Sequence, residues 1–91
     1  MIKRLQITIT GPRVQGVGFR FEAHLQMVDL GLTGSAENTR EGGVVLEAEG
    51  EEGILEKLLE WCKKGPEGSR VENVEVKEMS KNEVSEKNEQ K

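Results

Sequence analysis

The sequence predicts an α+β fold, in which a four-stranded antiparallel sheet carries two helices on one of its faces. Three segments alternate apolar and polar residues with the period of two that is typical of strands, and a fourth short segment is bounded by glycines. Two further segments place apolar residues at helical spacing. The 91 residues leave room for one domain, so we expect a single sheet covered by helices on one face.

The four strands can be placed from these patterns. The first is expected at residues 5–10, where three aliphatic side chains alternate with polar ones. Residues 32–38 and 44–49 predict a hairpin, because the glycine-containing turn at 39–43 separates them. The last strand is expected from about residue 70 to 79.

The first helix is expected from about residue 20 to 30, where Phe21, Leu25 and Val28 recur at helical spacing. Gly31 follows at the position where a left-handed conformation commonly ends a helix. The second helix carries an apolar stripe, which consists of Ile54, Leu55, Leu58, Leu59 and Cys62. Acidic residues near its start and lysines at its end complement the helix dipole.

The order strand, helix, strand, strand, helix, strand is the ferredoxin-like βαββαβ arrangement. We expect this domain to occupy residues 1–79. Residues 80–91 contain one aliphatic side chain, Val84, among lysine, glutamate, asparagine and glutamine. That composition predicts a polar, flexible C-terminal tail.

Composition argues against two classes of partner. The formal net charge is −4, whereas nucleic-acid binders usually carry a basic face. With one tryptophan, two phenylalanines and no tyrosine, the strands offer no platform for base stacking.

No apolar run approaches the roughly 20 residues that a membrane span needs. The N-terminus shows no apolar leader and Cys62 is the only cysteine, so we expect a cytoplasmic protein.

The glycine-rich loop at residues 11–20 is the candidate functional site of the sequence. Gly16 and Gly18 can adopt positive φ, which lets successive backbone N–H groups point into one concavity that binds anions. The following helix adds the partial positive charge of its N-terminus. Arg20 can bind two phosphate oxygens at once. These residues predict a phosphate cradle, although a tight turn with a surface arginine explains the loop equally well.

Four ordered segments resemble the acylphosphatase family. VQGVGFR at residues 14–20 is similar to the family's signature, and residues 30–38 resemble its LGLxGWVxN stretch. Residues 38–44 resemble the turn that follows, and residues 61–66 resemble the end of its second helix. The resemblance runs from about residue 7 to 79 with the same spacing between segments, and the family's fold is the ferredoxin-like one.

The resemblance implies an enzyme that hydrolyses acyl phosphates to a carboxylate and inorganic phosphate without a metal or cofactor. Arg20 would hold the phosphate and Asn38 would orient the attacking water. The phosphate would be lined by the loop residues Gln15, Gly16, Val17, Gly18 and Phe19. A small-molecule acyl phosphate would be the partner, and inorganic phosphate would be both product and inhibitor.

Three departures from the family pattern raise the hypothesis that this protein binds phosphate well but hydrolyses its substrate slowly. The loop entry is one residue longer than usual, through Pro12 or Arg13, which predicts a bulge or a tilt of the loop. Ser35 stands where the family has tryptophan. Residues 80–91 lack the short aromatic strand with which the family ends.

The alternative function is a catalytically weak phosphate-binding module on the same fold. The N-terminal domains of hydrogenase-maturation proteins resemble this fold and loop, but they belong to much longer chains. The shorter chain favours a stand-alone enzyme. We expect a monomer, and a dimer paired through an open sheet edge is the alternative.

Overall fold

The computed structural model describes residues 1–79, and these form the six predicted elements in the predicted order. They are β1 (Ile2–Thr10), α1 (Phe19–Asp29), β2 (Thr33–Asn38), β3 (Val44–Glu51), α2 (Glu52–Lys64) and β4 (Asn73–Met79). The βαββαβ arrangement is therefore confirmed. The predicted tail at residues 80–91 lies outside the described residues and stays a prediction.

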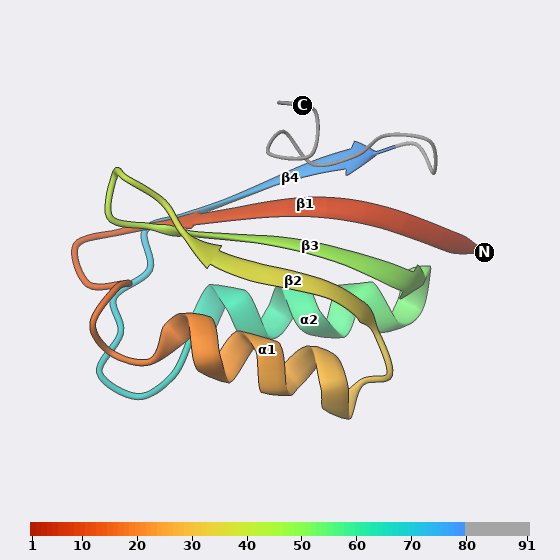
Figure 1. Cartoon of the computed structure of the whole chain (residues 1–91), viewed down its shortest axis with the longest axis horizontal. Coiled ribbons are helices and arrows are strands. Elements are labelled where there is room, and N and C mark those ends of the chain that lie inside the picture. Colours follow the sequence, from red (N-terminus) through yellow and green to blue (C-terminus); the bar gives the residue numbers. More distant parts are fainter. Residues whose placement is uncertain (80–91) are drawn as a thin grey trace, which may run out of the picture.

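The four strands form one antiparallel sheet in the order β2-β3-β1-β4. Both helices lie against the same face of this sheet (Figure 1). Alternate residues of the central strands face the helices, so that Ile7 and Leu46, which are paired in register, are fully buried. The α+β class predicted from the sequence is thus confirmed.

The second helix follows its predicted pattern closely. Leu55, Leu58 and Cys62 are buried, while Ile54 and Leu59 pack partly buried at the edge of the core. Within residues 1–79, neither helix is both long and apolar enough to cross a membrane. The amphipathic stripe of α2 therefore serves to cover the sheet.

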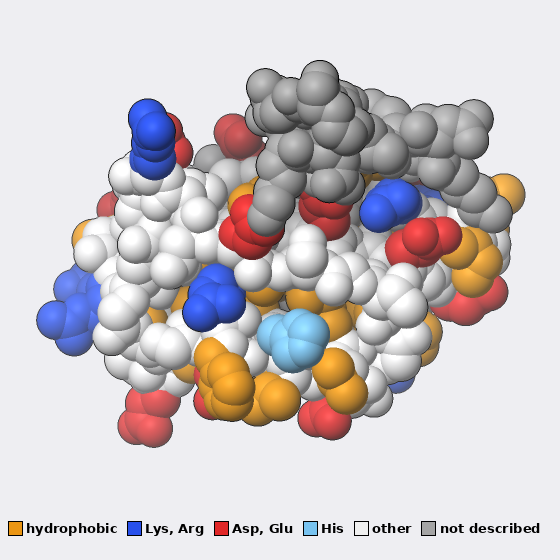
Figure 2. Space-filling model, viewed as in Figure 1, with side chains coloured by type: hydrophobic (Ala, Val, Ile, Leu, Met, Phe, Trp, Pro, Cys, Tyr) orange, Lys and Arg blue, Asp and Glu red, His pale blue; other side chains and the backbone are white. Residues whose placement is uncertain are grey.

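The first helix buries a different face from the one that its apolar spacing suggests. Phe21, Leu25 and Val28 are 63%, 41% and 59% exposed, respectively. The buried side of α1 consists instead of Phe19, Ala23 and Met27, which are spaced by four residues. Because α1 is apolar on both sides, spacing alone does not select the buried one. Figure 2 shows hydrophobic side chains gathered over α1 on the outside of the molecule.

The end of α1 has the left-handed glycine that the sequence predicts. Gly31 has φ of 75°, its N–H donates to the carbonyl of Val28 at 3.0 Å, and the N–H of Leu32 donates to that of Met27 at 2.9 Å. These two bonds form a Schellman motif. They stop the helix and turn the chain into β2, which ends at Asn38.

Cys62 is fully buried on the sheet-facing side of α2. Burial raises the pKa of its thiol to about 12, because the apolar surroundings disfavour the thiolate. The thiol therefore stays protonated and packs as a small apolar group.

This burial predicts a loss of stability at alkaline pH. The folded state holds the thiol proton more tightly than the unfolded state, so the contribution is complete below about pH 9. It is lost as the pH rises toward 12, at up to about 1.4 kcal/mol per pH unit. Urea unfolding at a series of alkaline pH values should show a shallower decline for Cys62→Ala than for the wild type. Equal slopes would contradict the assignment.

Candidate active site

Three connections lie together at one end of the sheet (Figure 1): the β1–α1 loop at residues 11–18, the β2–β3 turn at 39–43 and the α2–β4 loop at 65–72. The side chain of Gln15 bonds to the β2–β3 turn. Arg13 forms an isolated antiparallel bridge with Arg70 of the α2–β4 loop. The predicted cradle is therefore attached to both of its neighbours.

The backbone of the cradle has the conformation that an anion site needs. Gly16 and Gly18 have φ of 82° and 79°, whereas no non-glycine residue among residues 1–79 has positive φ. The sign of φ therefore alternates from Gln15 to Gly18, which turns successive N–H groups toward one side. Other residues adopt this positive-φ conformation only with strain.

The N-terminus of α1 adds further donors next to the cradle. Gly18 is its N-cap in a left-handed conformation, and no side chain of the described residues caps the helix there. The first bond of the helix runs from the N–H of Glu22 to the carbonyl of Gly18 at 2.9 Å. The N–H groups of the first turn are thus left for an anion, and the helix dipole favours one.

Phe19 fixes the point at which the cradle becomes a helix. Its ring is buried and meets the ring of Trp61 edge-on, with centroids 5.2 Å apart and an interplanar angle of 63°. On another side lies Gly65, where an added Cβ would come within 2.8 Å of Phe19 Cε2. Trp61, near the end of α2, thus holds the residue immediately before Arg20.

Gln15 connects the cradle to the turn that follows Asn38. Its Nε2 donates to the carbonyl of Thr39 at 2.7 Å and to that of Gly43 at 2.8 Å. The side chain is thus engaged with protein, which leaves the backbone of Gln15 for the phosphate. This connection holds the loop that leads to Arg20 against the end of the strand that carries Asn38.

Thr39 is a structural residue of this site that sequence reasoning missed. Its hydroxyl accepts the N–H of Gly43 at 2.9 Å, and its own N–H donates to the carbonyl of Gly43 at 2.9 Å. These bonds close the turn directly after Asn38. A threonine that follows the predicted water-positioning residue was the available signal, because hydroxyl side chains commonly bond to turn backbone.

Arg20 and Asn38 are both exposed, Arg20 in the first turn of α1 and Asn38 as the last residue of β2. Asn38 is paired in register with Val44. Arg20 forms no ion pair with any residue of the described part of the chain. Its guanidinium is therefore open to an anionic ligand.

The two departures that fall in the described residues leave this arrangement intact. Gly11 and Pro12 form a bend, and the Arg13–Arg70 bridge continues the register of β1 with β4, so there is no bulge against β4. Of the two expected outcomes, the bulge is not found against β4, and a tilt of the loop stays a prediction. Ser35 is exposed, opposite Glu47 on the helix-free face, so a tryptophan there would lie outside the core.

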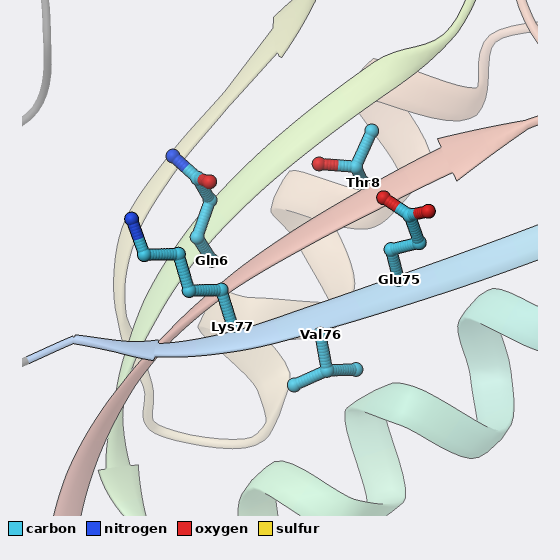
Figure 3. Close-up of a pocket in the computed structure, with 5 residues that line it drawn as sticks. All are labelled: Gln6, Thr8, Glu75, Val76 and Lys77. Atoms are coloured by element: carbon cyan, nitrogen blue, oxygen red, sulfur yellow. The ribbon is translucent and has the colours of Figure 1, made fainter.

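A separate open hollow of about 300 Å³ lies on β1 and β4, lined by Gln6, Thr8, Glu75, Val76 and Lys77. Figure 3 shows four of these side chains on one side of the strands and Val76 on the other. The hollow has no glycine-rich backbone and contains a carboxylate, so it does not suit a phosphate. Within residues 1–79, no three His, Cys, Asp or Glu side chains are placed together to hold a metal ion.

Comparisons with known proteins agree with this geometry. The family model described as Acylphosphatase matches residues 5–89. The chain is 42% identical over 79 residues to the acylphosphatase of Methylococcus capsulatus, a match that covers 87% of this chain and 85% of that one. The chain belongs to the acylphosphatase family. The family resemblance seen in the four sequence motifs is therefore confirmed.

Solved structures of acylphosphatases share the fold. An acylphosphatase from Coxiella burnetii superposes with a TM-score of 0.84 at 34% identity, covering 92% of this chain and 87% of that one. Full-length HypF in its phosphate- and nucleotide-bound form gives a TM-score of 0.82 at 33% identity. That match covers 91% of this chain and 11% of HypF, so the fold also occurs inside a far longer protein.

Removing the Gln15 side chain tests the connection between the two halves of the site. Gln15→Ala should lower the free energy of unfolding by about 1–3 kcal/mol, because it removes two hydrogen bonds, one of the two donors at each of the Thr39 and Gly43 carbonyls. It should also lower kcat by about one to two decades, because the turn after Asn38 is then less firmly placed. Urea unfolding and steady-state kinetics measure the two effects.

The matched control is Gln26→Ala on α1, a half-buried glutamine whose side chain makes no hydrogen bond within the described residues. If both variants lose the same stability and the same kcat, the Gln15 connection has no special role.

Proposed function

We propose that this acylphosphatase-family chain hydrolyses acyl phosphates by direct attack of water on phosphorus, without a metal. The observation that supports this most strongly is the alternating-φ cradle beside an uncapped helix N-terminus, which is attached through Gln15 to the turn after Asn38. In this proposal the backbone of residues 15–19 and the guanidinium of Arg20 bind the phosphate, and the Asn38 amide orients the water.

The reaction forms one bond and breaks one. The water oxygen bonds to phosphorus while the bond from phosphorus to the acyl oxygen breaks. The electron pair leaves with the carboxylate, and the proton released from water passes to phosphate or to solvent. The products are a carboxylate and inorganic phosphate.

Such a spare site suits this leaving group. The conjugate acid of the departing carboxylate has a pKa of about 4, so no general acid is needed. Phosphoryl transfer depends mainly on positioning and on stabilising charge over the phosphate oxygens. The backbone amides and Arg20 supply the charge stabilisation, and Asn38 supplies the alignment of the water.

The alternative of a catalytically weak phosphate-binding module is not favoured. Curated relatives at 42% and 43% identity, from Methylococcus capsulatus and Caldanaerobacter subterraneus, are named acylphosphatase. The exposed position of Ser35 and the continuous register at Arg13 also support normal turnover in this proposal. Normal turnover of benzoyl phosphate by the wild type would reject the slow-turnover hypothesis.

The proposal includes inorganic phosphate as a product that competes with the substrate for the cradle.

We also propose a monomer, which sedimentation would test against a dimer paired at a sheet edge. The single cysteine supports a reducing, cytoplasmic setting.

Two substitutions separate binding from chemistry. Arg20→Ala should abolish both turnover and inhibition by phosphate, because it removes the side chain that binds the phosphate. Asn38→Ala should keep phosphate inhibition and lower kcat by about two to three decades, since its amide acts on the water. Steady-state hydrolysis of benzoyl phosphate with phosphate as inhibitor measures both. An equal loss of both functions in Asn38→Ala would reject this division of roles.

Activity should be unchanged by a chelator, because every group in the proposed mechanism belongs to the chain. Hydrolysis of benzoyl phosphate is measured after dialysis against EDTA, with and without added Mg²⁺. A large loss on dialysis that added Mg²⁺ or Zn²⁺ restores would reject the metal-free mechanism.

A further inference from the structure

Two arginines lie directly opposite each other beside the cradle. The N–H of Arg70 donates to the carbonyl of Arg13 at 2.7 Å, and the N–H of Arg13 donates back to that of Arg70 at 3.4 Å. An antiparallel pair that exchanges both bonds has its Cα atoms about 5.5 Å apart, with both side chains on the same side. The two guanidinium groups therefore project from one place.

The positions of both arginines are set by the surrounding backbone. Val14, next to Arg13, is buried, so the neighbouring side chain of Arg13 points outward. The hydroxyl of Ser69, next to Arg70, donates to the carbonyl of Pro66 at 2.7 Å. An added Cβ on Gly11 would meet the backbone of Arg70, so only glycine allows the two segments to lie this close.

This arrangement has an electrostatic cost that the described part of the chain does not offset. Like charges directly opposite in a sheet destabilise it. Neither Arg13 nor Arg70 forms an ion pair or a side-chain hydrogen bond with any of residues 1–79. Glu72, whose N–H donates to the carbonyl of Thr10 at 2.9 Å, forms no ion pair with them either. Both arginines are exposed.

We propose that Arg13 and Arg70 bind a second anionic group of the substrate while the cradle holds the acyl phosphate. Arg13 and Gly16 are three positions apart in the chain, so their Cα atoms are at most about 11 Å apart. A distal carboxylate or phosphate carried a few bonds from the acyl carbon can span that distance. The preferred substrates are therefore acyl phosphates with a second anionic group, a preference that rests on the proposed function.

The distribution of arginines supports a substrate with a second anionic group. Arg13, Arg40 and Arg70 lie on the three connections at this end and Arg20 lies in the first turn of α1 next to them, in a protein whose net charge is −4. Figure 2 shows Lys and Arg side chains at this end of the molecule. The negative net charge repels a dianionic substrate, and the arginines at this end attract it. Arginine rather than lysine also suits the planar, two-point binding of carboxylate and phosphate.

The test uses stable ligands, so that it does not depend on turnover. Alkylphosphonates of two to five methylene groups are compared by calorimetry with phosphonates of the same lengths that end in a carboxylate. At the best length, the carboxylate should improve affinity of the wild-type chain by about ten-fold, as a charged hydrogen-bonded contact does. In the Arg13→Gln/Arg70→Gln double variant this ratio should fall to about one.

The control is the Lys57→Gln/Lys77→Gln double variant, which removes the same charge from exposed positions on α2 and β4. It should keep the wild-type ratio. A ratio near one for the wild type at every length would overturn the proposal, and so would an equal loss in the control, which would indicate long-range attraction only. Failure of turnover with this ratio intact would reject the proposed function but not the second anion site.

Inorganic phosphate distinguishes a substrate group from a free anion. In the Arg20→Ala variant, phosphate should bind no more tightly than to the same variant that also carries Arg13→Gln and Arg70→Gln. A phosphate site that persists in Arg20→Ala and disappears in the triple variant would overturn the assignment to substrate, because the pair would then bind a separate anion.

Discussion

The burial of Phe19 is the constraint on which the site depends. Its ring lies between Trp61 and Gly65, so the last residue before Arg20 is anchored in the core while the glycines before it are exposed. A loop rich in positive-φ glycine has a high conformational entropy in the unfolded chain. Anchoring it at Val14 and at Phe19 leaves a short span whose alternating φ turns its N–H groups toward one side.

The proposed site consists of several common features, none of which indicates a phosphate site by itself. Gly16 and Gly18 set the backbone, α1 supplies a dipole and free donors, and Gln15 connects them to the turn after Asn38. Each contribution is modest in water, but a preorganised site need not reorganise when charge develops. The surrounding arginines act in the same direction, against the negative charge of the rest of the chain.

The order of elements could be predicted because it depends on local patterns. Strand alternation, the stripe of α2 and the glycines of the cradle are all properties of neighbouring residues. The buried face of α1 could not be predicted from the sequence, because Phe19 and Phe21 lie on two apolar sides of the helix and packing against the sheet selects one of them. The contacts of Gln15 with Thr39 join residues 24 positions apart, and these depend on the register of strands that the sequence leaves open.

The Gln15 connection also couples anion binding at the proposed site to the stability of the fold. The cradle and the Asn38 turn belong to different supersecondary units, which are held together at this end by side-chain hydrogen bonds. In the proposed site, an anion held by the cradle binds the native chain and not the unfolded one. Phosphate at a hundred times its dissociation constant would then add about 2.7 kcal/mol to the stability of the fold.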